Sequence, residues 1–185
     1  MVLLKEIRWH GRGGQGCVTA SELLAKAVID EGRWAQAIPS FGPERRGAPV
    51  SAFNRISDEE IHVRSGVFKP DILIILDHTL LNLEGITDGL KEDGMIIINT
   101  NQTPEEIRKE MSYTGKLALV DANKIASEEI GVPIANTAIL GAVAKATGLV
   151  GMDSIAKVIS ERFPGRIGEK NAAAAKRAYE ETRTE

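Results

Sequence analysis

The sequence predicts an α/β fold: a three-layer α/β/α sandwich, Rossmann-like, around a central sheet that is mixed but mostly parallel. Short apolar strands alternate with helical patterns through residue 120, which is typical of strand–helix–strand units. Residues 72–76 form a continuous apolar run, as expected for a strand that is covered on both faces. From residue 136 onward the periodicity is helical, so terminal helices are expected to complete the outer layers.

Alternating apolar and polar residues predict the first strand at residues 4–10. The polar residues 57–60 separate two short alternating segments, which predicts an antiparallel hairpin and makes the sheet mixed. No strand is expected after Val120. The expected strands are residues 4–10, 34–38, 50–56, 61–63, 72–76, 95–98 and 116–120.

The first helix is expected to end before Gly32, because its apolar residues up to that point share one face. Thr103 is expected to cap a helix whose first turn carries negative charge, and Asp121 to cap a helix start at Ala122. The expected helices are residues 17–31, 78–83, 104–111, 124–130, 136–147, 152–162 and 169–182.

Length and composition predict a single domain over residues 1–185. A net charge of −3 and only 4% aromatic residues argue against a nucleic-acid partner. One cysteine cannot form an internal disulfide, a four-cysteine zinc site or an iron–sulfur cluster, which fits a cytoplasmic setting. The apolar runs are shorter than the ~20 residues of a membrane span, so no membrane partner is expected.

A glycine-rich segment lies between the first predicted strand and the first helix. Its spacing fits G-x-G-x-x-G, and we expect an irregular turn whose free amides and helix dipole receive an anion. An arginine in the segment offers a charge-assisted contact. The predicted binding residues are Gly11, Arg12, Gly13, Gly14, Gln15 and Gly16. The plain alternative is a structural turn that binds nothing.

A dinucleotide site would add an acidic residue about 20 positions after the glycines, at the end of the second strand. Residues 34–40 contain no acidic residue, and Glu31 precedes the strand. The sequence therefore argues against binding of NAD(P). The phosphate-binding Walker pattern is also absent, because no Gly-Lys-Ser/Thr sequence follows the glycines.

A second loop, residues 39–47, follows the second predicted strand. We expect it at the same sheet edge as the glycine turn, because ligands bind outside the carboxyl ends of parallel strands. Its arginines could bind a carboxylate or phosphate through paired hydrogen bonds. The alternative is a solvated turn. The candidate contacts are Glu44, Arg45, Arg46 and Gly47.

No residue is assigned a catalytic role and no metal site is expected, because the three histidines are isolated in sequence. His10 lies beside the glycine turn, where a structural role is favoured over ligand binding. Cys17 lies at the predicted helix start, where the dipole could activate a thiol, but a small helix residue is favoured.

Four segments together resemble the gamma subunit of pyruvate:ferredoxin oxidoreductase and related 2-oxoacid:acceptor oxidoreductases. They are residues 11–16, 41–47, 69–73 and 136–141, and they span nearly the whole chain. One departure is Ala48, where the family pattern has a second glycine; this bears on how closely the backbone of that loop can be approached.

The resemblance implies a subunit that supports CoA-dependent oxidative decarboxylation of pyruvate to acetyl-CoA and CO₂ with reduction of ferredoxin. It implies alpha, beta and delta subunits as partners, which would carry thiamine diphosphate, Mg²⁺ and 4Fe–4S clusters. The chain alone is expected to bind no cofactor and to be inactive, while coenzyme A could be handled at this subunit. Two alternatives are a stand-alone nucleotide-binding dehydrogenase, which would bind NAD(P)H by itself, and a non-enzymatic scaffold domain.

Overall fold

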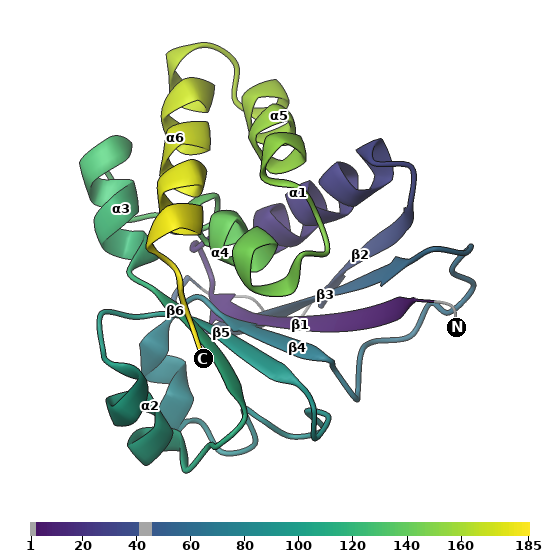
Figure 1. Ribbon diagram of the computed structural model, residues 1–185, viewed down its shortest axis with the longest axis vertical. Helices are drawn as coiled ribbons and strands as arrows, with labels where there is room; N and C mark the ends of the chain where they lie inside the picture. The colour runs from purple at the N-terminus through teal and green to yellow at the C-terminus, as the bar shows by residue number, and fades with distance from the viewer. Residues whose placement is uncertain (1–2, 41–45) are drawn as a thin grey trace.

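A computed structural model of the protein describes residues 3–40 and 46–185, and it contains one seven-stranded sheet (Figure 1). The strands run in the order β2-β3-β1-β4-β5-β6-β7. They are β1 (Leu4–Arg12), β2 (Trp34–Ser40), β3 (Pro49–Ser57), β4 (Ile72–Ile75), β5 (Met95–Asn99), β6 (Lys116–Val120) and β7 (Arg183–Thr184).

The centre of the sheet is parallel and its flanks are antiparallel. Strands β1, β4, β5 and β6 pair in parallel, while β3 pairs antiparallel with both β1 and β2, and β7 antiparallel with β6. The predicted α/β class with a mixed sheet is confirmed. The parallel strands place their carboxyl ends at one edge, which we call the carboxyl edge, and their amino ends at the opposite amino edge.

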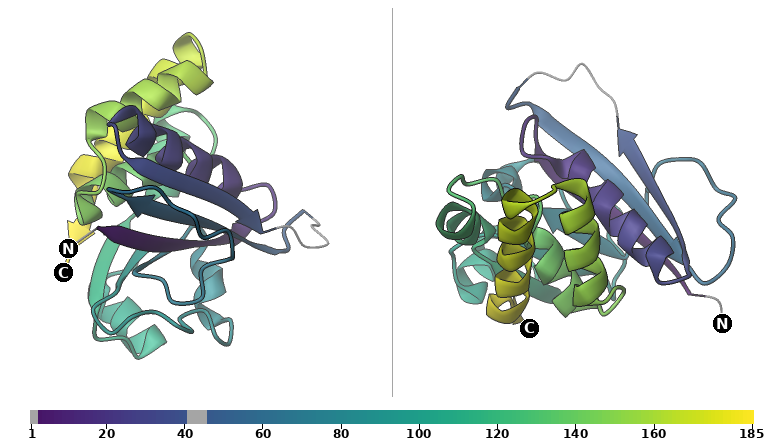
Figure 2. Two further views of the ribbon diagram at one scale, coloured as in Figure 1. Left: turned by 90° about the vertical axis from the view of Figure 1, so that its right-hand side faces the viewer. Right: turned by 90° about the horizontal axis from the view of Figure 1, so that it is seen from above.

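Helices cover the two faces unequally (Figures 1 and 2). One face carries α1 (Cys17–Asp30), α3 (Ala122–Glu129), α4 (Ala138–Thr147), α5 (Met152–Arg162) and α6 (Arg166–Glu181), and the other carries the 3₁₀ helix η1 (His78–Asn82) and α2 (Pro104–Met111). Strand β4 alternates between the two cores: Ile72 and Ile74 pack with the larger group of helices, and Leu73 and Ile75 with the smaller. The apolar run of β4 is therefore buried on both faces, as predicted.

Local sequence signals fix several element ends. The Thr103 side chain accepts from the Glu106 amide while the Glu106 carboxylate accepts from the Thr103 amide, which confirms a cap at Thr103. The Asp121 carboxylate accepts from the Lys124 amide and caps α3, also as predicted. Gly32 follows α1 with a positive φ of 83°, a conformation that favours glycine.

The predicted hairpin between residues 50–56 and 61–63 is wrong. Strand β3 pairs with β1 along one side and with β2 along the other, so neither of its sides is free for a further strand. Residues 61–63 form no strand. The hairpin partner of β3 is β2, and the connection between them contains residues 41–45, which lie outside the described residues.

Four smaller expectations also need correction. Strand β1 continues through Gly11 and Arg12, which pair with Val50 and Pro49, so the irregular turn is shorter than predicted. A strand does follow Val120, because β7 pairs with β6. Finally, the segment expected as a helix at residues 78–83 is a 3₁₀ helix, and α6 begins before residue 169.

Candidate functional site

The glycine turn connects β1 to α1 at the carboxyl edge. Gly14 and Gly16 have positive φ values of 95° and 77°, which strongly favour glycine. A Cβ added to Gly16 would lie 2.5 Å from Nδ2 and 3.0 Å from Cβ of Asn136, so this position also lacks space. Gly16 is the N-cap of α1, and no side chain caps the amides of the first helical turn.

The second loop meets the glycine turn, as expected from the sheet order. The Gly13 amide donates to the Ala48 carbonyl at 2.8 Å, and the Gly47 amide donates to the Gly13 carbonyl at 3.0 Å. A Cβ on Gly14 would be 3.9 Å from Cγ of Arg46, so this exposed arginine lies beside the turn. Glu44 and Arg45, the other predicted contacts of this loop, lie outside the described residues.

Arg12, a predicted ligand contact, makes several hydrogen bonds within the protein. Its guanidinium donates to Oδ2 of Asp77 at 3.2 Å, to Oγ1 of Thr79 at 2.8 Å and to the Gly47 carbonyl at 3.2 Å. These partners engage three of the five N–H donors of the guanidinium, and the carboxylate compensates its charge. In this arrangement Arg12 ties the two loops to η1.

Gln15 and Asp77 complete this network. Gln15 accepts from the Arg12 amide through Oε1 at 2.7 Å and donates to Asp77 through Nε2 at 2.8 Å. Partial burial opposes ionisation of Asp77, but hydrogen bonds from Thr79 and Gln15 and the charge of Arg12 hold its pKa below the ordinary value. Asp77 belongs to no motif in the sequence that would indicate that its carboxylate anchors the glycine turn.

A pocket of about 140 Å³ opens beside the glycine turn. It lies between β1 and β4, where the sheet order reverses; in open α/β sheets, ligands bind at such switch points. The lining is mostly apolar and consists of Gly14, Gln15, Leu76, Asn123, Pro133, Ile134 and Ala135. We call it the switch-point pocket. Asn123 and residues 133–135 were not among the predicted site residues, because no motif connects them to the glycines.

The sheet order also argues against a dinucleotide site at the glycine turn. In dinucleotide-binding folds the acid that holds the ribose lies at the end of the strand beside β1. Here β3 lies between β1 and β2, and β2 carries no acidic residue.

His10 and Cys17 have structural roles. Burial, and secondly the charge of Arg8, lower the pKa of His10 to about 4, so the neutral ring accepts from Arg8 Nε at 3.0 Å. Burial raises the pKa of Cys17 to about 12, which removes thiolate character at neutral pH. The lowered pKa of His10 and the raised pKa of Cys17 both favour structural roles for these residues, as the sequence did.

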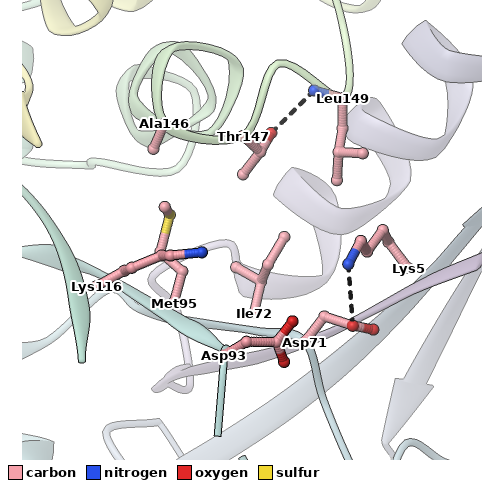
Figure 3. Close-up of a pocket in the computed structure, with 9 residues that line it drawn as sticks. All are labelled: Lys5, Asp71, Ile72, Asp93, Met95, Lys116, Ala146, Thr147 and Leu149. Carbon is pink, nitrogen blue, oxygen red and sulfur yellow. Dashed lines mark hydrogen bonds and ion pairs between the residues drawn. The ribbon is translucent and has the colours of Figure 1, made fainter. Parts of the chain in front are cut away.

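A second hollow, of about 220 Å³, lies at the amino edge (Figure 3). Lys5 and Asp71 form an ion pair of 3.2 Å in it, and the side chains of Lys116, Asp93 and Met95 face the same space. This hollow is larger than the switch-point pocket. Ligands of parallel α/β sheets nevertheless bind at the carboxyl ends of the strands. We therefore place the candidate site at the switch point.

Within residues 3–40 and 46–185 no three histidine, cysteine or acidic side chains gather as a metal site would require. In the same part of the chain, no helix has the length and apolar character needed to cross a membrane. The one cysteine of the sequence is buried in the core, so the chain does not fit an iron–sulfur cluster.

Comparisons with known proteins agree with this fold. The chain is 53% identical to the pyruvate/ketoisovalerate oxidoreductases common subunit gamma of Thermococcus kodakarensis, with 96% of each chain covered. It is 53% identical to the pyruvate synthase subunit PorC of Methanothermobacter marburgensis, covering 95% of this chain and 96% of the relative. The crystal structure of pyruvate oxidoreductase subunit PORC from Thermotoga maritima matches with a TM-score of 0.89, 43% identity and 98% coverage of both chains.

A family model describes the same relationship along the chain. The model for pyruvate ferredoxin/flavodoxin oxidoreductase matches residues 6–181. This range includes the glycine turn, the second loop and the lining of the switch-point pocket. The chain therefore belongs to the pyruvate ferredoxin/flavodoxin oxidoreductase family.

Proposed function

We propose that this chain is the gamma subunit of a multi-subunit pyruvate (2-oxoacid):ferredoxin oxidoreductase. The observation that carries the proposal is full-length similarity at 53% identity to subunits with that role. The subunit would support oxidative decarboxylation of pyruvate to acetyl-CoA and CO₂ together with its alpha, beta and delta partners, and ferredoxin would accept the electrons.

The choice of 2-oxoacid would belong to the companion subunits. Relatives of equal identity are named for pyruvate alone and for pyruvate and ketoisovalerate together. A subunit common to two oxidoreductases cannot by itself select between their substrates. Thiamine diphosphate, Mg²⁺ and the 4Fe–4S clusters would likewise reside on partners, since this chain has a single, buried cysteine.

Coenzyme A would meet this subunit at the carboxyl edge. The switch-point pocket of about 140 Å³ is smaller than the ~300–1,000 Å³ of complete ligand sites, so it would hold one end of the molecule. The amides at the start of α1 and the exposed Arg46 would receive phosphate oxygens. The apolar residues Leu76, Pro133 and Ile134 would exclude water from the enclosed end.

Co-purification tests the subunit assignment. A tag on this chain, co-expressed with its companion subunits, is expected to recover them in fixed proportion together with pyruvate-dependent ferredoxin reduction. Recovery of this chain alone would contradict the assignment, and micromolar NAD(P)H binding by the isolated chain would favour a stand-alone dehydrogenase instead.

A charge reversal tests the coenzyme A site. In the assembled complex, Arg46→Glu is expected to weaken coenzyme A binding about tenfold, because one charge-assisted phosphate contact is worth about 1.5 kcal/mol. Arg64→Glu is the matched control, since Arg64 is an exposed arginine in another loop. Equal affinity in the two variants, measured by calorimetric titration, would refute the placement.

A further inference from the structure

The connection between α3 and α4 and the start of α6 expose several aliphatic side chains. Val132 and Ile134 are each 44% exposed, and Ile167 is 62% exposed. Ile130 and Ile167 line one hollow of about 310 Å³. We call Ile130, Val132, Ile134 and Ile167 the aliphatic patch. Isolated exposed apolar residues are common on proteins, whereas a group of them marks an interaction surface.

The backbone that carries the aliphatic patch is held in place. The Gly131 amide donates to the carbonyls of Ala126 and Ser127 and so closes the end of α3. At the other end of the loop Ala135 is buried and Asn136 packs against Gly16. The exposed side chains are therefore presented in a fixed arrangement, which lowers the entropy cost of binding.

Within the described part of the chain, the hollow beside the patch is lined by two cations and no carboxylate. Arg166 and Lys170 line the same hollow as Ile130 and Ile167, and among the described residues no carboxylate lies within 4.0 Å of either cation. Three nearby carboxylates, Glu128 and Glu129 of α3 and Glu181 of α6, pair with Arg177. Glu169 lies between the two cations in sequence but does not line the hollow. The residues of the loop itself, 130–137, carry no charge. Carboxylates of a partner would therefore complement this rim.

The patch is continuous with the candidate site. Ile134 belongs to the patch and also lines the switch-point pocket, together with its neighbour Pro133. A segment that covers the aliphatic side chains would reach the entrance of that pocket.

We propose that the aliphatic patch, with Arg166 and Lys170, docks an amphipathic segment of another subunit of the complex that carries both apolar and acidic side chains. The proposal rests on the proposed function, since it requires a companion subunit. Apolar residues of the segment cover the isoleucines while its carboxylates pair with the two cations. Docking there also helps to close the switch-point pocket.

Two variants of the co-expressed complex test the docking. Ile167→Ser removes an exposed aliphatic group, and Arg166→Glu with Lys170→Glu reverses the rim charge. Each is expected to weaken retention of a companion subunit about tenfold, as loss of an interface hot spot does. Ile29→Ser is the matched control, because Ile29 is 52% exposed on α1, away from the patch. Subunit ratios are quantified over rising salt concentration.

A photo-cross-linking amino acid at position 167 identifies the occupant directly. The expected product is a peptide of a companion subunit that contains aspartate or glutamate. Thermal unfolding of the isolated variants separates a loss of docking from a loss of folding. If Ile167→Ser is unfolded, the charge-reversed variant and the cross-link test the docking proposal.

Retention of all companions by both variants at the level of Ile29→Ser would overturn the docking inference and leave the proposed function intact. A cross-linked peptide without acidic residues, or one from a second copy of this chain, would overturn it as well. A wild-type chain that retains no companion would instead contradict the proposed function itself.

Discussion

At the carboxyl edge of the parallel strands, glycines with positive φ and a network around Asp77 hold a turn that leads into a helix start without a side-chain cap. At the amino edge, the carboxylate of Asp71 is instead surrounded by Lys5, Lys91 and the Glu6 amide. At the first edge no side chain caps the start of α1, whereas at the second edge the Asp71 carboxylate is satisfied by groups of the protein itself. The comparison supports the proposal that a ligand binds at the carboxyl edge, and it assigns Asp71 at the amino edge a role in stability.

The largest loss of unfolding free energy is expected for Gly16→Ala, at the carboxyl edge. The positive φ and the contact with Asn136 together should cost about 3 kcal/mol of unfolding free energy. Gly148→Ala is the control, because its φ is 60° but an added Cβ meets nothing within 4 Å. It should lose about 1 kcal/mol in urea unfolding. Equal losses would show that Asn136 imposes no steric limit.

At the amino edge, Asp71→Asn should cost about 2 kcal/mol at neutral pH, because a buried carboxylate loses charge-assisted bonds to two lysines and an amide. The lysines are partly exposed, so solvent screening keeps the loss below that of a fully buried pair. Asp93→Asn, an exposed change in the same hollow, should be neutral within about 0.5 kcal/mol. Similar losses in the two variants would remove the special role of Asp71.

Asp77→Asn should cost only about 1 kcal/mol of unfolding free energy, because the amide keeps part of the network and Arg12 is partly solvated. Its main effect should be local. Amide hydrogen exchange of residues 13–16 is expected to accelerate, because the single oxygen of the Asn side chain cannot accept from both Gln15 and Thr79 as the two carboxylate oxygens do. Unchanged exchange there, with the stability loss present, would contradict the role assigned to Asp77.

The smallest expected effect is the pH dependence of the unfolding free energy, to which Asp71 at the amino edge and Asp77 at the carboxyl edge should both contribute. The pKa values of both Asp71 and Asp77 lie below the ordinary value of about 3.9. Their ionised forms therefore stabilise the fold fully above about pH 4, and this contribution disappears as the pH falls through the lowered folded-state values. The difference in unfolding free energy between the wild type and each Asn variant should shrink below pH 4. A constant difference down to pH 2 would refute the linkage.

Local signals in the sequence predicted much of the fold. The strand–helix alternation, the caps at Thr103 and Asp121 and the apolar run of β4 all depend on nearby residues. The hairpin of β3 was missed because strand pairing depends on contacts distant in sequence, and residues 61–63 have a strand-like pattern without a free strand beside them. The short β7 carries no pattern that distinguishes it from a helix end.

The candidate site was predictable only in part, again because some of its contacts join residues that are distant in sequence. Sequence order placed the glycine turn and the second loop at one edge, and the bonds between Gly13 and the residues 47–48 confirm that placement. The engagement of Arg12 by Asp77 and the lining by Asn123 and residues 133–135 arise from segments more than 60 residues away. The binding roles of Gly11–Gly16 and Glu44–Gly47 remain predictions.

Hydrogen–deuterium exchange of the assembled complex, with and without coenzyme A, compares the two edges most directly. The account predicts protection of residues 13–18 and 131–136, around the switch-point pocket, with no change at Lys5, Asp71 and Lys116. Protection confined to the amino edge would contradict it.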